Sequence, residues 1–175
     1  LLTLYPHSSE SHLLHHPNIK FTSLQAESMK IPQLIEEISS IDTKAEFEKL
    51  DKLITHAKEN YSIEGIVHGG ILSKYQKDNF SSICEKNNLE IISPLWNTKP
   101  ESYMKKLLEE NFEYIISSVS SDGLNDSWLG QIIDKNRLET LEKLQKKFGF
   151  NLNFEGGEAE TFVINCPLFE KSLFI

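Results

Sequence analysis

The chain has 175 residues, of which 39% are hydrophobic and 25% charged, and its formal net charge is -8. This composition is typical of a folded protein and argues against disorder and against a membrane span, which needs about 20 consecutive apolar residues. The acidic balance argues against sequence-independent binding to a nucleic-acid backbone. Cys84 and Cys166 lie far apart without CxxC spacing, so we expect no disulfide scaffold, no zinc knuckle and a cytoplasmic location.

The first hundred residues alternate short apolar runs with helical patterns. Four apolar runs of strand length predict strands, at residues 1–5, 34–38, 63–67 and 89–92. Three capping signatures of the S/T-x-x-E/Q type predict helix starts, at Thr22 with Gln25, Thr43 with Glu46 and Ser73 with Gln76. Strands that alternate with helices are typical of a mostly parallel sheet with helices on both faces. We therefore expect an α/β domain over residues 1–97.

The pattern becomes less regular beyond Pro94, which indicates a second, smaller α+β lobe over residues 98–175. Its predicted elements are a helix that is capped at Thr98 and has Pro100 in its first turn, a strand at 112–119, a turn-rich segment at 120–130, a helix at 138–148, and strands at 161–164 and 172–175. Gly149 is expected to end the last helix as a C-terminal cap.

A glycine turn, His68-Gly69-Gly70, separates the predicted strand at 63–67 from the helix that follows it. Open α/β sheets bind ligands at such junctions, because the turn lies at the carboxyl end of a strand and helix-end amides favour anions. Two interpretations remain open here. Ser73 and Gln76 either contact a ligand or only cap the helix.

The stretch Glu155-Gly156-Gly157-Glu158-Ala159-Glu160 has the most distinctive composition in the chain. Three carboxylates fall within six residues, they flank a Gly-Gly pair, and an apolar β-forming run follows. Adjacent glycines allow positive φ angles and a close approach to a ligand, whereas clustered carboxylates repel one another unless a cation, a metal or hydrogen bonds compensate. The stretch is either a hairpin turn with solvated glutamates or a site for a cationic or amine-bearing substrate.

Three segments together resemble one family, the diphthine ammonia ligases and their archaeal ATP-binding relatives. They are Gly69-Gly70-Ile71-Leu72-Ser73-Lys74-Tyr75-Gln76, Gly123-Leu124-Asn125-Asp126-Ser127-Trp128-Leu129-Gly130 and Glu155-Gly156-Gly157-Glu158-Ala159-Glu160-Thr161-Phe162-Val163. The resemblance runs in order along essentially the whole chain and includes Pro94-Leu95-Trp96. It implies a PP-loop fold of the adenine nucleotide alpha hydrolase type, followed by a family-specific lobe that carries the acidic motif.

The resemblance also implies a reaction, in which ATP is used to amidate diphthine, a modified histidine of translation elongation factor 2, to give diphthamide. The enzyme would be a ligase that forms a C–N bond through an acyl-adenylate attacked by ammonia, with Mg²⁺ neutralising phosphate charge. The implied partners are elongation factor 2 and ammonium. A homodimer is one possible assembly, and neither a membrane nor a nucleic acid is an expected partner.

Candidate site residues follow from the same resemblance. The expected catalytic residues are Glu155, Glu158 and Glu160, which could pair with the trimethylammonium group of diphthine, or one of which could remove a proton from ammonium. The residues expected to bind ATP are Gly69, Gly70, Ser73, Tyr75 and Gln76. Those expected to bind the acceptor are Gly156, Gly157 and Thr161, and no residue is expected to hold a metal.

One departure from the family pattern concerns the phosphate loop. The family's Ser-Gly-Gly-Lys-Asp-Ser sequence does not occur in the chain, and the run from Leu1 to Tyr5 resembles the strand that follows that loop. We therefore expect a head segment to be missing. Two other functions remain open: a PP-loop ligase for another acceptor, such as an RNA base or a small carboxylic acid, and a non-catalytic binding module if the protein begins at Leu1.

Overall fold

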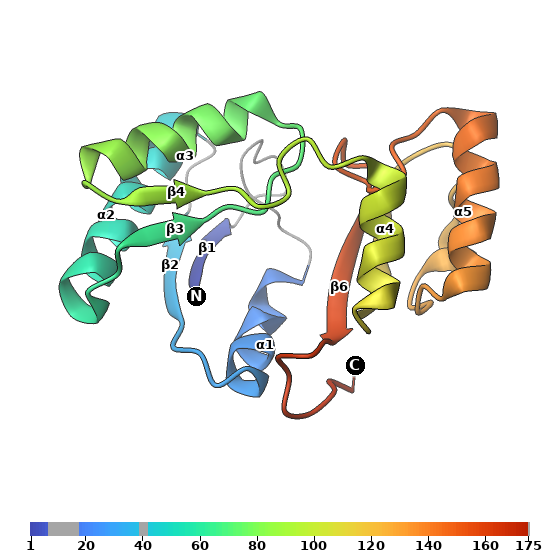
Figure 1. The fold of residues 1–175 in the computed structure, drawn as a ribbon, viewed down its shortest axis with the longest axis horizontal. Helices are drawn as coiled ribbons and strands as arrows, with labels where there is room; N and C mark the ends of the chain where they lie inside the picture. Colours follow the sequence, from blue (N-terminus) through green and yellow to red (C-terminus); the bar gives the residue numbers. More distant parts are fainter. Residues whose placement is uncertain (7–17, 39–41, 175) are drawn as a thin grey trace. The chain divides into compact units, whose positions relative to one another are not determined.

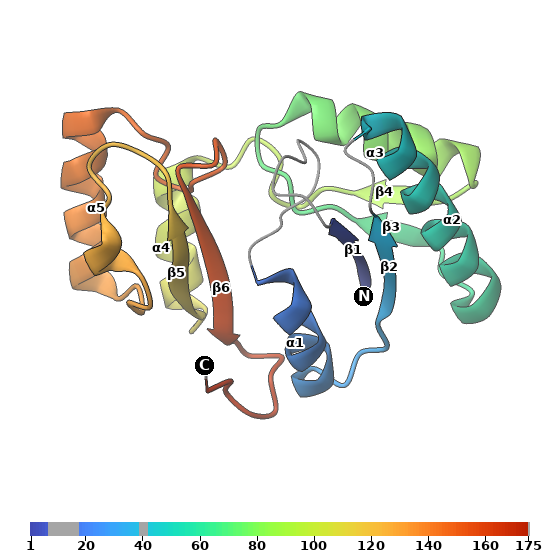
Figure 2. The ribbon, with the colours of Figure 1, turned by 180° about the vertical axis from the view of Figure 1, so that it is seen from behind.

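A computed structural model of the chain describes residues 1–6, 18–38 and 42–174, and Figures 1 and 2 show its ribbon from opposite sides. The chain forms two compact units. Unit 1 comprises Leu1–Lys20 and Pro32–Asn97, and unit 2 comprises Phe21–Ile31 and Thr98–Ile175. Among the described residues, none of the helices combines the length and the apolar character that crossing a bilayer requires.

The described residues of unit 1 form two parallel ladders of two strands each. Its elements are β1 (Leu2–Pro6), β2 (Leu34–Ile38), α2 (Thr43–Tyr61), β3 (Gly65–Val67), α3 (Lys74–Lys86) and β4 (Glu90–Ile92). The ladders are β1 with β2 and β3 with β4, so the predicted strands of this unit are confirmed. A single mostly parallel sheet is not confirmed, because no strand pairing joins the two ladders within the described part of the chain. An apolar pattern predicts which residues are buried and leaves open which strand edges pair.

One hydrophobic core lies between these strands and helices α2 and α3. Its buried members are Leu4, Ile38, Leu50, Leu53, Ile54, Ile83, Cys84 and Leu89. The other face of the β3–β4 ladder is open, since Val67 is 69% exposed and its ladder partner Ile92 is 48% exposed. Helices on both faces are therefore not observed for this ladder among the described residues.

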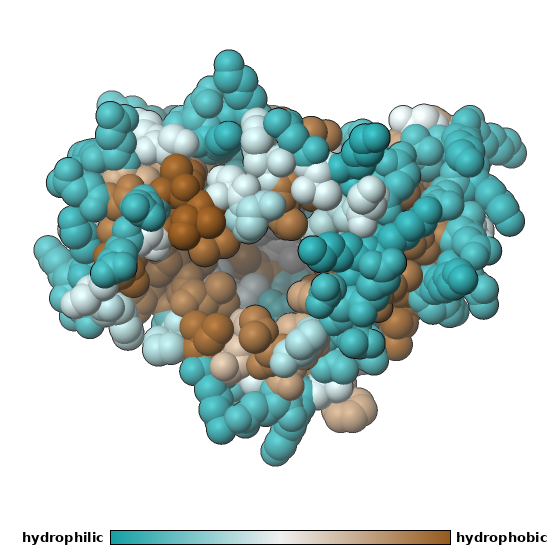
Figure 3. Space-filling model, in the orientation of Figure 1, coloured by the Kyte–Doolittle hydropathy of each residue, from teal (hydrophilic) through white to brown (hydrophobic). Residues whose placement is uncertain are grey.

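Unit 2 is built on an antiparallel pair of strands. Its elements are α1 (Thr22–Ser28), which follows the short 3-10 helix η1 (Ile19–Phe21), then α4 (Pro100–Glu109), β5 (Glu113–Val119), the 3-10 helix η2 (Asp126–Trp128), α5 (Lys135–Phe148) and β6 (Ala159–Asn165). Strand β5 pairs with β6, with a register shift between Ile116 and Ser118. The core contains Met104, Tyr114, Ile116, Leu138, Leu141 and Phe154. On the face shown in Figure 3, the region of α4 and α5 is mainly hydrophilic, as expected for helices whose apolar stripes are buried.

Helix α1 comes early in the sequence and packs on β6 of unit 2. Nε2 of Gln25 donates a hydrogen bond to the carbonyl oxygen of Val163 at 2.8 Å. Oγ of Ser28 donates to the carbonyl oxygen of Lys171 at 2.6 Å. A helix from the first part of the chain thus belongs to unit 2. The expected division into a nucleotide-binding domain before residue 98 and a family-specific lobe after it stays a prediction.

Two of the predicted helix caps are confirmed. Ser73 is the N-cap of α3, where its Oγ accepts a hydrogen bond from the backbone N–H of Gln76 at 3.4 Å. Gly149 ends α5 in the left-handed region with φ 83°, as a glycine C-terminal cap requires.

The other capping predictions are wrong by one residue. The N-cap of α2 is Asp42, whose side chain accepts from the backbone N–H of Lys44. Helices α1 and α4 begin after Phe21 and Lys99, and neither of these N-caps makes a side-chain hydrogen bond. Pro100 occupies the first helical position of α4, where its missing N–H costs nothing. No strand is found at residues 172–174.

Asp51 of α2 holds the end of α3 in unit 1. Its Oδ2 accepts from Nζ of Lys86 at 2.5 Å, and its Oδ1 accepts from Nδ2 of Asn87 at 2.7 Å. The hydrogen bond from Lys86 is the largest cause of a lowered Asp51 pKa, and burial opposes it. Asn87 also accepts from Oγ1 of Thr55 at 3.0 Å. The junction of α2 and α3 is therefore a network of hydrogen bonds centred on one carboxylate.

We predict that Asp51→Ala lowers the free energy of unfolding by about 1–3 kcal/mol at about pH 7, because it removes two hydrogen bonds to a charged group. The pKa of Asp51 is lowered in the folded protein, so the stabilisation is present above the unfolded-state pKa of about 3.9 and is lost as pH falls through the folded-state value. Urea unfolding at a series of pH values measures this. Asp78→Ala, at an exposed position of α3, is the matched control. A difference between wild type and Asp51→Ala that stays constant down to acidic pH would contradict the account.

Candidate functional site

The glycine turn after β3 packs on a buried histidine. His68 is 7% exposed, its backbone N–H donates to the carbonyl oxygen of Ile92 at 2.8 Å, and its ring stacks on Phe80 with 4.5 Å between centroids. A Cβ added to Gly70 would lie 2.3 Å from Cε1 of His68, whereas one added to Gly69 would meet no atom within 4 Å. Gly70 is therefore required by the space that the imidazole occupies, and the turn is open at Gly69.

All five residues predicted to bind ATP lie in this turn or at the start of α3. They are Gly69, Gly70, Ser73, Tyr75 and Gln76. The ring of Tyr75 is exposed and makes an edge contact with Phe47 at 6.4 Å between centroids. The structure brings these residues together in unit 1 and confirms that Ser73 caps the helix. Contact with a ligand by the same residues stays a prediction.

The loop after β4 contacts the same region of unit 1. The backbone N–H of Asn97 donates to the carbonyl oxygen of Ile71 at 2.9 Å, which joins this loop to the glycine turn. Nζ of Lys77 lies 4.2 Å from the ring centroid of Trp96, a cation–π contact. A lysine near a helix start opposes the helix dipole, and the face of the indole partly compensates its charge.

The acidic stretch forms a loop that one of its own glutamates closes. Oε1 of Glu158 accepts from the backbone N–H of Asn151 at 2.9 Å and from Nδ2 of the same residue at 2.7 Å. Oε2 of Glu158 accepts from the backbone N–H of Gly156 at 2.9 Å. Residues 150–154, which precede the loop, do not form a strand. The interpretation as a hairpin turn with solvated glutamates therefore does not describe this segment.

The two glycines of the loop have different roles. A Cβ on Gly156 would lie 2.7 Å from Oε1 of Glu158, so Gly156 makes room for the carboxylate. Gly157 has φ 81°, which a glycine adopts without strain. Phe154 also has a positive φ, 60°, which costs free energy for a residue with a side chain. The loop is thus held in one strained conformation by the hydrogen bonds of Glu158.

A tyrosine of α4 lies within the electrostatic reach of this loop. Burial raises the pKa of the Tyr103 phenol, and the negative charge of Glu155 raises it further. Figure 1 shows that the start of α4 and the start of β6 lie at the same end of unit 2. Tyr103 packs against the core of that unit. An aromatic ring near a carboxylate is suited to a cationic amine, which both groups attract.

The remaining predicted residues lie on β6. Glu160 is half-buried opposite Ser118, and Thr161 is exposed opposite Ile116. The three glutamates therefore differ in their surroundings, since Glu158 closes the loop, Glu155 is near Tyr103 and Glu160 belongs to a strand. All of them lie in unit 2 with Gly156 and Gly157.

Sequence reasoning missed several residues of these two regions. Tyr103 was not among the predicted site residues, and Trp96 was named only as part of a resembling motif. His68 was named only as part of the glycine turn and Asn151 not at all, because their roles depend on contacts that the fold creates. The hydrogen bonds from Asn151 to Glu158 span seven residues of irregular backbone, which no periodic pattern predicts.

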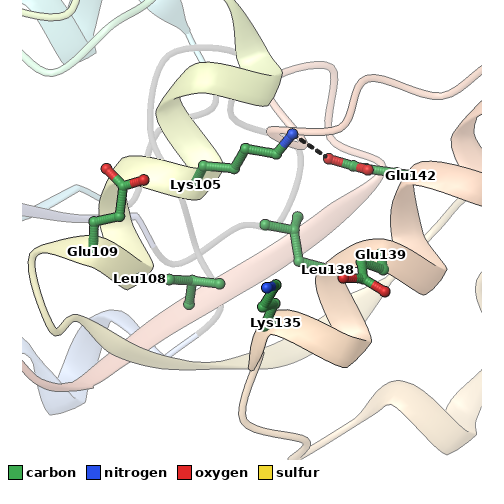
Figure 4. A pocket seen from close by; sticks show the side chains of 7 residues that line it. All are labelled: Lys105, Leu108, Glu109, Lys135, Leu138, Glu139 and Glu142. Atoms are coloured by element: carbon green, nitrogen blue, oxygen red, sulfur yellow. Dashed lines mark ion pairs between the residues drawn. The ribbon is translucent and has the colours of Figure 1, made fainter.

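Two further observations concern metal ligands and a groove in unit 2. Among the described residues, no group of three His, Cys, Asp or Glu side chains could hold a metal ion. A groove of about 500 Å³ lies between α4 and α5, where Lys105 and Glu142 point toward each other and form an ion pair of 3.2 Å (Figure 4). None of the predicted site residues lines this groove.

Comparison with known proteins extends these observations. The family model of the diphthamide synthase N-terminal domain matches residues 1–91, and that of the diphthamide synthase C-terminal domain matches residues 99–175. Diphthine–ammonia ligase from Bos taurus is 36% identical and the one from Homo sapiens is 34% identical, each over 163 residues that cover 87% of this chain and 61% of the relative. Diphthine–ammonia ligase from Saccharomyces cerevisiae is 28% identical over 141 residues, which cover 71% of this chain and 20% of the relative.

The chain therefore spans about 61% of the length of the mammalian relatives that it matches over 163 residues. The two domain matches follow one another along the chain and together cover nearly all of its residues. The N-terminal match alone covers more than half of them. On this evidence the chain belongs to the diphthamide synthase family.

Proposed function

We propose that this chain takes part in the ATP-dependent amidation of diphthine on translation elongation factor 2, with ammonium as the nitrogen source and diphthamide as the product. Membership of the family and the names of the relatives support this proposal. The structural observation that carries it is the acidic loop, which Glu158 closes and in which the negative charge of Glu155 acts on the phenol of Tyr103 and helps to raise its pKa. That combination of carboxylate and aromatic ring suits the fixed trimethylammonium cation of diphthine.

The reaction would proceed in two steps. An oxygen of the diphthine carboxylate attacks the α-phosphorus of ATP, which forms an acyl-adenylate and releases pyrophosphate. The nitrogen of ammonia then attacks the acyl carbon, and AMP leaves with that carboxylate oxygen. Ammonium must first lose a proton to become ammonia, and a carboxylate of the acidic loop would accept that proton. We propose that unit 1 binds ATP and that unit 2 binds the cationic part of the acceptor.

Within unit 1, the glycine turn and the start of α3 would contact ATP. Backbone amides near Gly69 and Gly70 suit phosphate oxygens, and the side chains of Ser73, Tyr75 and Gln76 lie beside them. The open space around Gly69 would let a ligand approach the backbone closely.

Within unit 2, Glu155 and Glu160 are the candidates for contact with the cation or with ammonium. Glu158 acts as a positioning residue in this proposal, because its carboxylate oxygens already accept three hydrogen bonds within the loop. Gly156, Gly157 and Thr161 would line the path of the acceptor. Both cysteines are free and buried, which agrees with a cytoplasmic location.

Mg²⁺ is implied by the use of ATP. The described residues offer no cluster of three ligands for a metal. Mg²⁺ commonly keeps several waters and binds through substrate phosphates and one or two carboxylates. We therefore expect it to enter with ATP, where it would neutralise the charge of the leaving pyrophosphate.

Incubation of the protein with ATP, ammonium and diphthine-bearing elongation factor 2, followed by mass measurement of the acceptor, tests the proposed function. We expect conversion of the carboxylate to the amide only when ATP and ammonium are both present. Conversion without ATP, or none with all components present, would contradict the proposal.

The same assay tests the role of Glu158. Glu158→Ala is expected to abolish amidation or to slow it on the order of 100-fold, because the loop loses the three hydrogen bonds that fix its geometry. Backbone N–H exchange at Gly156 should speed up, while the circular dichroism of the fold is unchanged. Glu139→Gln, at an exposed position of α5, is the control. An unchanged amidation rate in Glu158→Ala would remove this residue from the site.

Gly70→Val is expected to weaken ATP binding by about tenfold, because the new side chain collides with the His68 ring and displaces the turn. Calorimetric titration with ATP measures the affinity. Removal of the collision by His68→Ala in the Gly70→Val background should restore part of the affinity. Equal ATP affinity in wild type and Gly70→Val would exclude the glycine turn from the nucleotide site.

A further inference from the structure

A buried acid lies on the core face of α2 in unit 1. Glu46 is 1% exposed, and its helical spacing places it on the same side as Leu50 and Leu53, which belong to the core. An apolar residue would normally occupy such a position, because burial of a carboxylate carries a large desolvation cost. Glu46 therefore calls for an explanation that its helix alone does not provide.

Neither carboxylate oxygen of Glu46 has a hydrogen-bond partner among the residues that the structure describes. The expected capping interaction with the helix start is also absent, since Asp42 occupies the N-cap. By contrast, Asp51 on the same helix is hydrogen-bonded to Lys86 and Asn87. A buried acceptor that receives no hydrogen bond destabilises the fold, and its retention points to a partner that the described residues do not supply.

Glu46 also lies where nucleotide-binding sheets hold their ligands. Helix α2 follows β2, so its first turn lies beyond the carboxyl end of that strand. Ser93 directly follows the carboxyl end of β4, and its buried Oγ likewise has no partner among the described residues. His68, which is buried, directly follows β3. Buried polar groups thus follow three of the four strands that the structure describes in unit 1.

We propose that the Glu46 carboxylate binds the nucleoside part of ATP by accepting a hydrogen bond from a ribose hydroxyl or from the adenine amino group. This inference rests on the proposed binding of ATP. The oxygens of a carboxylate accept hydrogen bonds, so a ligand group that satisfies them must be a donor. The phosphates of ATP carry negative charge and would be repelled, whereas the nucleoside carries donors at the two ribose hydroxyls and at the amino group. The start of α3 remains for the phosphates.

The proposal also predicts how Glu46 affects the stability of the protein without ligand. If Glu46 is kept for binding, it destabilises the free protein, because its desolvation is not compensated. Glu46→Leu should then raise the melting temperature of the free protein while it weakens ATP binding. A residue with a purely structural role would show the opposite change in melting temperature.

Calorimetric titration of wild type, Glu46→Gln and Glu46→Leu with four nucleotides tests the inference. The nucleotides are ATP, its 2′-deoxy and 3′-deoxy analogues, and inosine triphosphate, which lacks the amino group. Wild type should bind at least one analogue about tenfold more weakly than ATP, and Glu46→Leu, which removes the acceptor, should bind ATP and that analogue equally. The analogue that loses affinity identifies the donor. Glu48→Gln, at an exposed position of the same helix, is the matched control and should keep the wild-type preference.

The outcomes separate this inference from the function on which it rests. Failure of wild type to bind ATP would overturn both. ATP binding by wild type with equal affinity in Glu46→Leu would overturn only the role of Glu46. A loss of affinity that appears only with Mg²⁺ present, without any change in preference among the nucleotides, would assign the carboxylate to the metal and overturn the nucleoside contact. A lower melting temperature in Glu46→Leu would also overturn it.

Discussion

The Glu158 carboxylate is the interaction on which the acidic loop depends. It accepts hydrogen bonds from two backbone N–H groups, of Asn151 and Gly156, and from the Asn151 side chain. Charge-assisted hydrogen bonds of this kind are stronger than neutral ones. They hold the backbone through the strained positive φ of Phe154. A loop fixed before any ligand arrives loses less conformational entropy on binding, which favours affinity.

The glycine turn of unit 1 is fixed in a comparable way by different contacts. The His68 ring fills the space beside Gly70 and stacks on Phe80, and the hydrogen bond from Asn97 to Ile71 holds the loop after β4 against the turn. In both units the glycines among the candidate residues lie on irregular backbone that its surroundings hold in place. Function is commonly carried by loops that a rigid scaffold positions. Each unit provides such a scaffold through its own hydrophobic core.

The sequence predicts those features whose signal is local. Ser73 begins a helix and Gly149 ends one, as their capping chemistry predicts, and the four apolar runs of the first hundred residues correspond to strands. The acidic Gly-Gly stretch stands out by composition alone. Features that depend on distant contacts could not be predicted in this way. The hydrogen bond from Gln25 to Val163 joins residues 138 positions apart, so nothing near α1 indicates that it packs on β6.

For the candidate site, too, only the local features could be predicted from the sequence. Residue type and spacing located the loop, but they could not separate the roles of its glutamates. That separation depends on which carboxylate folds back onto the backbone, and here Glu158 does so. Glu46 was misread for a related reason, since a glutamate three residues after a threonine fits a capping box as well as it fits a buried position. Only the burial of its carboxylate distinguishes the two.

The central claim is that the acidic loop receives the cation of the acceptor while unit 1 receives ATP. The most direct measurement is the affinity of wild type and Glu155→Gln for diphthine-bearing elongation factor 2 without nucleotide, together with their affinity for ATP. The account predicts that Glu155→Gln weakens acceptor binding on the order of tenfold and leaves ATP affinity unchanged. Equal acceptor affinity in the two proteins, or a loss confined to ATP, would contradict it.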